Sequence, residues 1–160
     1  MPSRAFIGDA CVFLSFIEGH PERAADIREL LTRADDGKLE IVTSTLTIVE
    51  VAFHPDEKGN HLLSADIEER IRKLWVPPSP VKLADVHRGV AEDARSLIRS
   101  AIASGLDGLK PHDAIHLATA VALDAAFQTY DERLPRYASL VTVKIEQPFV
   151  EQGQLPLNAP

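Results

Sequence analysis

The hydrophobic residues of this chain follow two patterns, one typical of buried strands and the other of amphipathic helices. Short apolar runs bounded by turn residues predict strands, and apolar residues three or four positions apart predict helices. The predicted strands cover residues 3–8, 39–43, 81–83, 126–130 and 141–146. The predicted helices cover residues 10–19, 21–37, 44–53, 63–74, 86–105 and 111–124.

The order of these elements indicates the fold class. Most neighbouring strands are separated by one or two helices, which predicts an α/β fold with a mainly parallel sheet flanked by helices. The 160 residues are enough for one domain. We assign residues 1–147 to this domain and 148–160, with their prolines and Gly153, to a loosely packed C-terminal extension. Ligands of such folds bind beyond the carboxyl ends of the strands.

Four acidic residues stand in strongly hydrophobic surroundings. Asp9, Glu50 and Asp113 are each the only Asp, Glu, Lys or Arg in a window of about a dozen residues. Asp131 follows the predicted strand 126–130, where a crevice is expected. Burying a lone carboxylate costs several kcal/mol, so each acid needs a partner, a proton or a cation.

Local structural roles explain three of these acids equally well. Asp9 and Asp131 are suited to cap the segments that follow them, and Asp113 lies in the first turn of its helix, where the helix dipole favours an acid. Glu50 has no such role, because it lies in mid-helix beside the apolar stripe of Leu46, Val49 and Phe53. We therefore interpret Glu50 as functional.

A divalent cation would explain why four acids share such settings. If the four converge, their mutual repulsion raises several pKa values unless a cation neutralises them. A set of carboxylate ligands without thiolate favours Mg²⁺ or Mn²⁺ over zinc. Mg²⁺ held by a few carboxylates is the usual arrangement for phosphate chemistry.

These motifs resemble those of the PIN-domain ribonucleases, most closely the VapC toxins of prokaryotic toxin–antitoxin pairs. The matching segments are FIGDACVFL, STLTIVEVAF, KPHDAIHLATAVALDA and FQTYDERL, which together extend from Phe6 to about Val143. No segment is specific alone, but their order and spacing are. The resemblance implies a PIN-like three-layer sandwich and a metal-dependent endoribonuclease that cleaves RNA.

Carried over position by position, the resemblance also implies residue roles and partners. Asp9 and Asp113 correspond to direct ligands of Mg²⁺ or Mn²⁺, while Glu50 and Asp131 complete the pocket. Thr129 corresponds to a hydroxyl that orders the fourth acid. Family members are often homodimers and are held inactive by a cognate antitoxin. One departure concerns Asp9, which is followed by Ala and Cys where the family often has Thr and then Asn or Ser.

Two other functions remain open on the sequence. His112 and His116 flank Asp113 in an H-D-x-x-H pattern close to the H-E-x-x-H zinc motif, which suggests a zinc hydrolase. However, no later histidine supplies a third ligand, and we interpret His116 as a packed or hydrogen-bonded residue and His112 as exposed. The second alternative is a PIN-like module that binds a partner without catalysis.

Charge and composition set the remaining expectations. The net charge of −7 argues against non-specific adhesion to nucleic acid but permits a substrate held by local cations such as Arg133 and Arg136. The single cysteine, Cys11, excludes an internal disulfide, and we expect it to be a small buried residue. No apolar run has the length of a membrane span, and we expect a cytoplasmic protein.

Overall fold

A sheet of five strands in the order β3-β2-β1-β4-β5 forms the centre of the molecule. This computed structural model describes residues 2–52 and 55–148. Every strand pairing is parallel, which confirms the α/β class and the parallel sheet predicted from the sequence. The strands are β1 (Ser3–Ile7), β2 (Leu39–Ser44), β3 (Val81–Ala84), β4 (Ala126–Gln128) and β5 (Ile145–Glu146).

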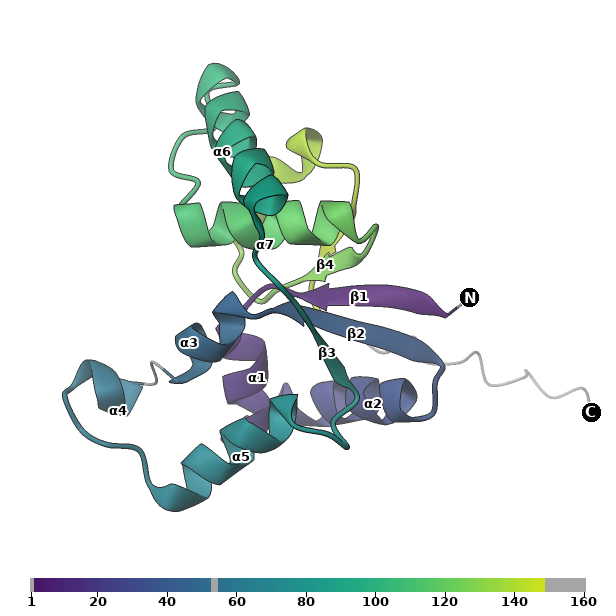
Figure 1. Ribbon diagram of the computed structural model, residues 1–160, viewed down its shortest axis with the longest axis vertical. Coiled ribbons are helices and arrows are strands. Elements are labelled where there is room, and N and C mark those ends of the chain that lie inside the picture. The colour runs from purple at the N-terminus through teal and green to yellow at the C-terminus, as the bar shows by residue number, and fades with distance from the viewer. Residues whose placement is uncertain (1, 53–54, 149–160) are drawn as a thin grey trace, which may run out of the picture.

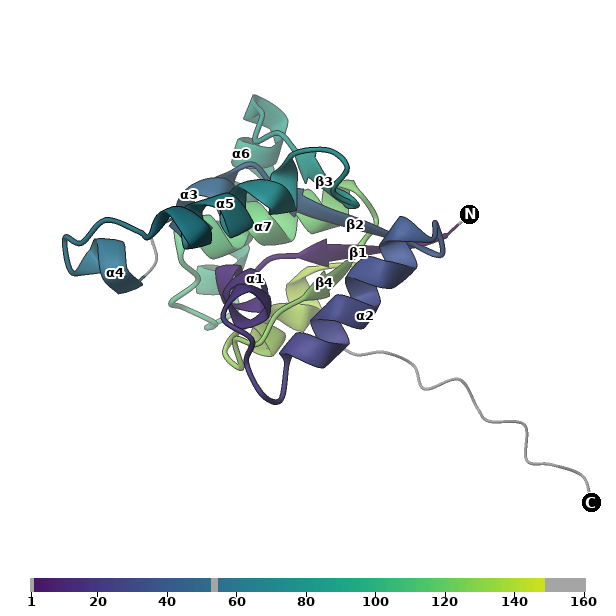
Figure 2. The same ribbon diagram turned by 90° about the horizontal axis from the view of Figure 1, so that it is seen from below.

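Helices cover both faces of this sheet. They are α1 (Ala10–Ile17), α2 (Ala24–Asp35), α3 (Leu46–Ala52), α4 (Pro55–Lys58), α5 (Ala65–Trp75), α6 (Arg88–Ala103) and α7 (Pro111–Ala122), with a 3₁₀ helix, η1 (Leu134–Leu140). In Figure 1, α6 and α7 lie above the strands, and α1, α2 and α5 lie below them. Figure 2, seen from below, shows α1 nearly end-on beside β1. The arrangement is the predicted three-layer sandwich.

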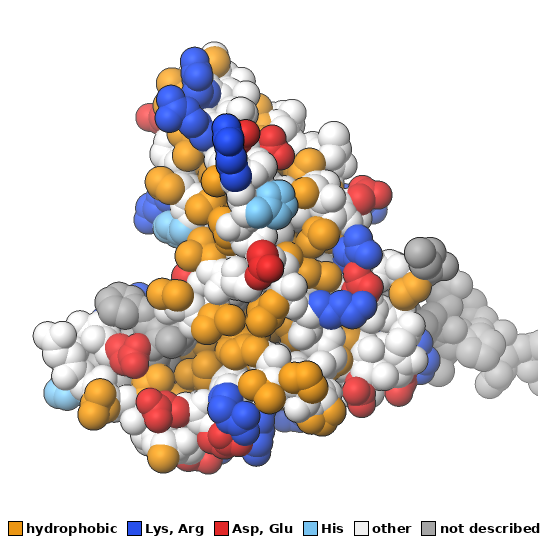
Figure 3. Space-filling view, in the orientation of Figure 1, with side chains coloured by type: hydrophobic (Ala, Val, Ile, Leu, Met, Phe, Trp, Pro, Cys, Tyr) orange, Lys and Arg blue, Asp and Glu red, His pale blue; other side chains and the backbone are white. Residues whose placement is uncertain are grey.

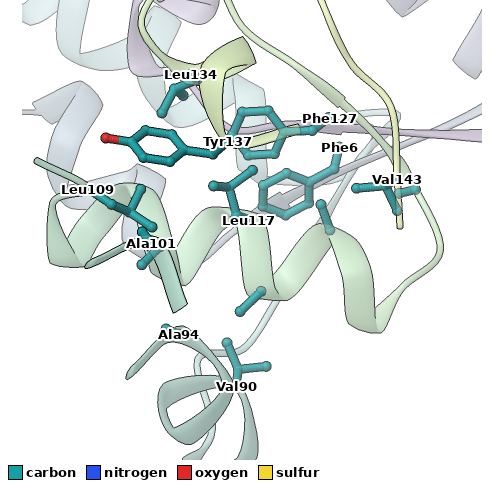
Figure 4. Packing of buried hydrophobic residues seen from close by; sticks show 14 of the residues in the cluster. Phe6, Val90, Ala94, Ala101, Leu109, Leu117, Phe127, Leu134, Tyr137 and Val143 are labelled. Atoms are coloured by element: carbon teal, nitrogen blue, oxygen red, sulfur yellow. The ribbon is translucent and has the colours of Figure 1, made fainter. Parts of the chain in front are cut away.

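Alternation along the strands divides the core into two clusters. Successive strand residues point to opposite faces, so Phe6 joins the cluster under α6, α7 and η1, whereas Ile7 joins the cluster with α1, α2 and α5. The rings of Phe6 and Phe127 stack with centroids 5.8 Å apart, beside Leu117 of α7 (Figure 4). Both faces of the sheet are therefore buried, as the near-continuous apolar strands predict.

Some predicted boundaries are wrong by a few residues. Helix α2 begins at Ala24 and not at Pro21, because residues 21–23 form a turn in which the His20 carbonyl accepts the amides of Arg23 and Ala24. Strand β5 contains only Ile145 and Glu146 of the predicted 141–146, because η1 and the turn after it bring the chain to the sheet late.

Other boundaries agree with the predictions. Gly37 ends α2 with a φ of 72°, a left-handed conformation that glycine adopts at low cost. The predicted end of α3 near Phe53 and the C-terminal extension beyond residue 148 lie outside the described residues. Within residues 2–52 and 55–148, no helix is long and apolar enough to cross a membrane.

Candidate functional site

The four acids singled out in the sequence line one cleft. Strands β1, β2 and β4 end on the left in Figure 1, where α3 and the first turn of α7 approach the same place from the two layers. The outline of the space-filling view is indented on this side, between the upper and lower parts (Figure 3). The cleft measures about 530 Å³. It is lined by Gly8, Asp9, Ala10, Leu46, Val49, Glu50, Lys58, His112, Asp113, Asp131 and Arg133.

Asp9 is held by three hydrogen bonds at the joint between β1 and α1. Its Oδ1 accepts the amide of Cys11 at 2.9 Å, so it caps α1 as one of the two interpretations predicted. Its Oδ2 accepts the Thr129 hydroxyl and the Tyr130 amide, both at 3.1 Å. Oδ1 accepts one bond and can accept another, so capping does not prevent Asp9 from binding a cation through this oxygen.

Asp113 is the least compensated of the four carboxylates. It lies in the first turn of α7, is buried, and has one ion-pair partner among the described residues, His112, whose Nε2 is 3.4 Å from Oδ1. Burial raises the pKa of Asp113 above its ordinary value, opposed by His112 and reinforced by the nearby Asp131 carboxylate. A bound cation would therefore stabilise the ionised form of Asp113 more than that of the other three acids.

Asp131 has the opposite environment. The Arg133 guanidinium makes two hydrogen bonds to it, Nε to Oδ1 at 3.0 Å and Nη2 to Oδ2 at 2.6 Å. This ion pair lowers the pKa of Asp131 below its ordinary value. The Thr129 hydroxyl also accepts the Asp131 amide at 2.9 Å, so one threonine side chain connects Asp9 to the loop that holds Asp131.

The setting of Glu50 differs from the prediction. Val49 is 66% exposed and lines the cleft with Leu46, so the predicted apolar stripe does not face the core. Of residues 46–51, Thr47 and Val51 are the buried ones. The third stripe residue, Phe53, lies outside the described residues. Glu50 itself is half-buried rather than enclosed.

Glu50 also has a partner that sequence reasoning missed. Its Oε2 lies 2.8 Å from Nε2 of His116, which is only 1% exposed. The sequence signal for this pair was a polar ring among the apolar residues of α7, but nothing in the local pattern identified which acid it contacts.

The donor chemistry of the cleft fits a hard divalent cation. All four acids offer carboxylate oxygens, the ligands that Mg²⁺ and Mn²⁺ prefer. No group of three His, Cys, Asp or Glu side chains in the described part of the chain is arranged as a ready metal site. His116 and Arg133 bond to Glu50 and Asp131, which leaves Asp9 and Asp113 as the better candidates for direct ligands.

The alternative zinc site receives no support from the geometry. His116 is buried with its Nε2 on Glu50, whereas His112 is exposed and lies beside Asp113. The two rings therefore contact different carboxylates and do not share a site. The structure confirms that His116 is hydrogen-bonded and that His112 is exposed.

Two further residues differ from or refine the predictions. Cys11 is exposed, not buried as expected. Partial desolvation of its sulfur and the Asp9 carboxylate raise the pKa of the Cys11 thiol to about 11, so it is not a thiolate nucleophile at neutral pH. Arg136 does not line the cleft; its Nη2 lies 4.0 Å from Asp107.

Comparison with known proteins gives one family and one fold. Residues 7–140 match the family model of the PIN domain. A comparison with curated protein sequences found no significant match.

Several solved structures share the fold at low sequence identity. A chain of VapBC2 from Rickettsia felis, bound to a DNA fragment from its promoter, has a TM-score of 0.65 and 17% identity over 90% of this chain and 98% of its own. DNA-bound VapBC from Salmonella typhimurium gives 0.62 and 17% over 92% and 98%. FitAcB from Neisseria gonorrhoeae gives 0.62 and 16% over 90% and 97%. At these identities the likeness is one of fold.

Proposed function

The chain belongs to the PIN domain family, and we propose that it is a metal-dependent endoribonuclease, the toxin of a toxin–antitoxin pair. One observation supports the proposal most. Asp9, Glu50, Asp113 and Asp131, which are far apart in the sequence, line one cleft at the carboxyl ends of parallel strands. Four carboxylates in one cleft are unfavourable for stability alone, so a function that uses their charge is the simplest explanation.

Mg²⁺ or Mn²⁺, held by Asp9 and Asp113, would activate a water and offset charge on the phosphate. One of the other two acids would orient a water and accept its proton as the water oxygen bonds to phosphorus and the P–O bond opposite it breaks, releasing a ribose oxygen that takes up a proton. Glu50 is well suited to this role, because Oε2 is fixed by His116 while Oε1 has no hydrogen bond among the described residues. Asp131, with both oxygens on Arg133, is the alternative.

The rim of the cleft provides positive charge for an RNA backbone. Arg133 and Lys58 line it together with the acids. These local cations allow a chain with a net charge of −7 to bind a polyanion at this one place. We place its action in the cytoplasm, together with its RNA substrate.

An antitoxin is the proposed partner. The solved structures of similar fold named above are VapBC2 from Rickettsia felis and VapBC from Salmonella typhimurium, both bound to DNA, and FitAcB from Neisseria gonorrhoeae. The exposed hydrophobic residues Val76, Leu83 and Val86 give a partner an apolar surface, and Figure 3 shows such side chains gathered over the region of β3 and α5. A homodimer is also proposed, from the family resemblance alone.

Cleavage of labelled RNA by the purified protein, with Mg²⁺, with Mn²⁺ and with EDTA, tests the proposal. Metal-dependent cleavage is expected, and Asp9→Asn and Asp113→Asn are each expected to lower it by about two orders of magnitude or more. Asp26→Asn is the matched control, since Asp26 is also a first-turn helix acid but is exposed and outside the cleft. It should cleave at the wild-type rate.

Each contrary result has a definite meaning. Equal cleavage by wild type and both cleft variants would mean that the activity is contamination or belongs to another site. A folded wild-type protein that binds RNA or a partner but cleaves nothing would support the non-catalytic module. Zinc-dependent activity that survives Asp9→Asn would support the H-D-x-x-H alternative.

A further inference from the structure

His116 is a buried polar side chain whose polar contact within the described residues is with Glu50. Its ring is 1% exposed and packs against Phe6, with centroids 6.0 Å apart. Nε2 lies 2.8 Å from Glu50 Oε2, whereas Nδ1 is buried with no hydrogen-bond partner in the described part of the chain. A Nδ1–H there would lack an acceptor, so the tautomer with its proton on Nε2 is favoured. In that form His116 donates to Glu50.

Packing alone does not explain an imidazole at this position. Most of the other buried residues of α7 are apolar, among them Ala114, Leu117 and Ala120, and Asp113 and Thr119 are the polar ones. A leucine would fill a similar volume without leaving a buried nitrogen unpaired, a defect that reduces stability. The bond to Glu50 is what the imidazole adds.

The bond also joins the two halves of the cleft. Glu50 lies on α3, which packs with α1 and α5, and His116 lies on α7, which packs with α6 in the opposite layer. The carboxylate of Glu50 is half-buried at the cleft wall, and its Oε2 is fixed from behind by a ring that does not line the cleft. The ring can therefore act on the chemistry only through Glu50.

We propose that His116 is a positioning residue, which holds the Glu50 carboxylate at the wall of the acidic cleft in the orientation needed for catalysis. The inference rests on the proposed function. It predicts that loss of the Nε2–H bond lowers turnover without weakening the binding of RNA, because the ring touches no substrate.

Kinetics of four variants test this role. His116→Leu is expected to lower kcat by about 10- to 100-fold, with KM changed less than about twofold. His116→Gln, whose amide nitrogen reaches the position of Nε2, should recover most of the loss, and His116→Asn, whose amide ends near Nδ1, should not. Thr119→Val is the control and should keep the wild-type kcat. The hydroxyl of this buried α7 residue donates to the Ile115 carbonyl of its own helix and has no other bond within the described residues.

The comparison of His116→Gln with His116→Asn decides the question even if His116→Leu does not fold. Equal kcat in these two variants, or a wild-type kcat in a folded His116→Leu, would overturn the inference.

A second measurement does not need nuclease activity. In a double-mutant cycle of urea denaturation, the midpoint shifts of Glu50→Ala and His116→Leu are expected to sum to more than the shift of the double variant, because both single changes break the same bond. Additive shifts would show that the bond contributes nothing and would overturn the inference. An inactive wild-type protein with a non-additive cycle would instead overturn the proposed function, and the catalytic role of His116 with it, while leaving the bond established.

Discussion

At the residue scale, the acids of the cleft are distinguished by their neighbours. Asp113 is buried near another carboxylate, which raises its pKa, and Asp131 is paired with Arg133, which lowers its pKa. Pairs of acids whose environments push their pKa values apart are typical of catalytic sites. The same contacts explain why Asp113 is a candidate ligand and Asp131 an acid that stays ionised.

The raised pKa of Asp113 predicts how stability depends on pH. At pH values between its ordinary pKa of 3.8 and the raised value, the folded protein binds more protons than the unfolded chain. The stability that protonated Asp113 contributes is therefore fully present below pH 3.8 and is lost as the pH rises through the pKa of the folded state. The Asp113→Asn variant has no titrating carboxyl group at this position, so it does not lose this contribution to stability as the pH rises. In EDTA its free energy of unfolding should match wild type at acidic pH and exceed it at neutral pH.

Urea denaturation at several pH values measures this effect. Asp26→Asn, the exposed first-turn acid of α2, should show no such gain with rising pH. If Asp113→Asn were less stable than wild type at neutral pH, the carboxylate would stabilise α7 by itself, which would contradict its interpretation as a cation ligand.

At the element scale, the joint between β1 and α1 sets the position of Asp9. Gly8 donates its amide to the Gln128 carbonyl at 3.1 Å, and the ring of Phe127 occupies the space that a Cβ at Gly8 would need. A Cβ at Gly8 would lie 2.1 Å from the Phe127 Cζ atom. A glycine is therefore required here for close approach, and the strand can lead into the cap of α1 without displacing the buried ring.

Gly8→Ala is accordingly expected to lower the free energy of unfolding by about 1–3 kcal/mol, because the methyl group must displace a ring in a packed core. Thermal or urea denaturation measures the loss. Gly89→Ala is the control, since its Cβ would meet only the exposed His87 ring at 3.2 Å and alanine favours the helix. Phe127→Leu in the Gly8→Ala background should recover part of the loss, and a Gly8→Ala variant as stable as wild type would contradict the packing described.

At the scale of the whole molecule, the sheet joins two hydrophobic clusters into one cooperative unit. Phe6 and Ile7 are adjacent in β1 but belong to different clusters. If one layer unfolds, it exposes one face of β1 while the other layer still covers the opposite face, so we expect the two layers to unfold together. The cleft depends on this unity because Glu50 comes from one layer and His116 and Asp113 from the other.

Leu117→Ala tests the cooperativity. Removal of this fully buried side chain of α7 should cost about 2–5 kcal/mol, and the transition followed by fluorescence of Trp75, in the opposite layer, should shift as much as that followed by circular dichroism. Ile102→Ala, 63% exposed on α6, should change stability by less than about 0.5 kcal/mol. An unshifted Trp75 transition would mean that the layers unfold separately.

Much of this architecture follows from local sequence. Periodicity predicts the strands and helices because burial repeats every two residues on a strand and every 3.6 on a helix, and the order of elements predicts the parallel sheet. Isolated acids in apolar windows indicate Asp9, Glu50 and Asp113 because an unpaired buried carboxylate is too costly to occur without a reason. Their common location follows from the rule that parallel strands end at one edge.

Tertiary packing alone decided which face of α3 is buried and which partner each distant acid receives. Val49 looks like a core residue in the sequence but lies exposed in the cleft, and Glu50 meets His116 across 66 positions of the chain. A local pattern reports how hydrophobic a residue's neighbours are in the sequence. It does not report the direction from which another layer of the fold approaches. That direction decides whether a carboxylate stays available for a cation, as proposed for Asp113, or is bonded to a buried ring, as Glu50 is to His116.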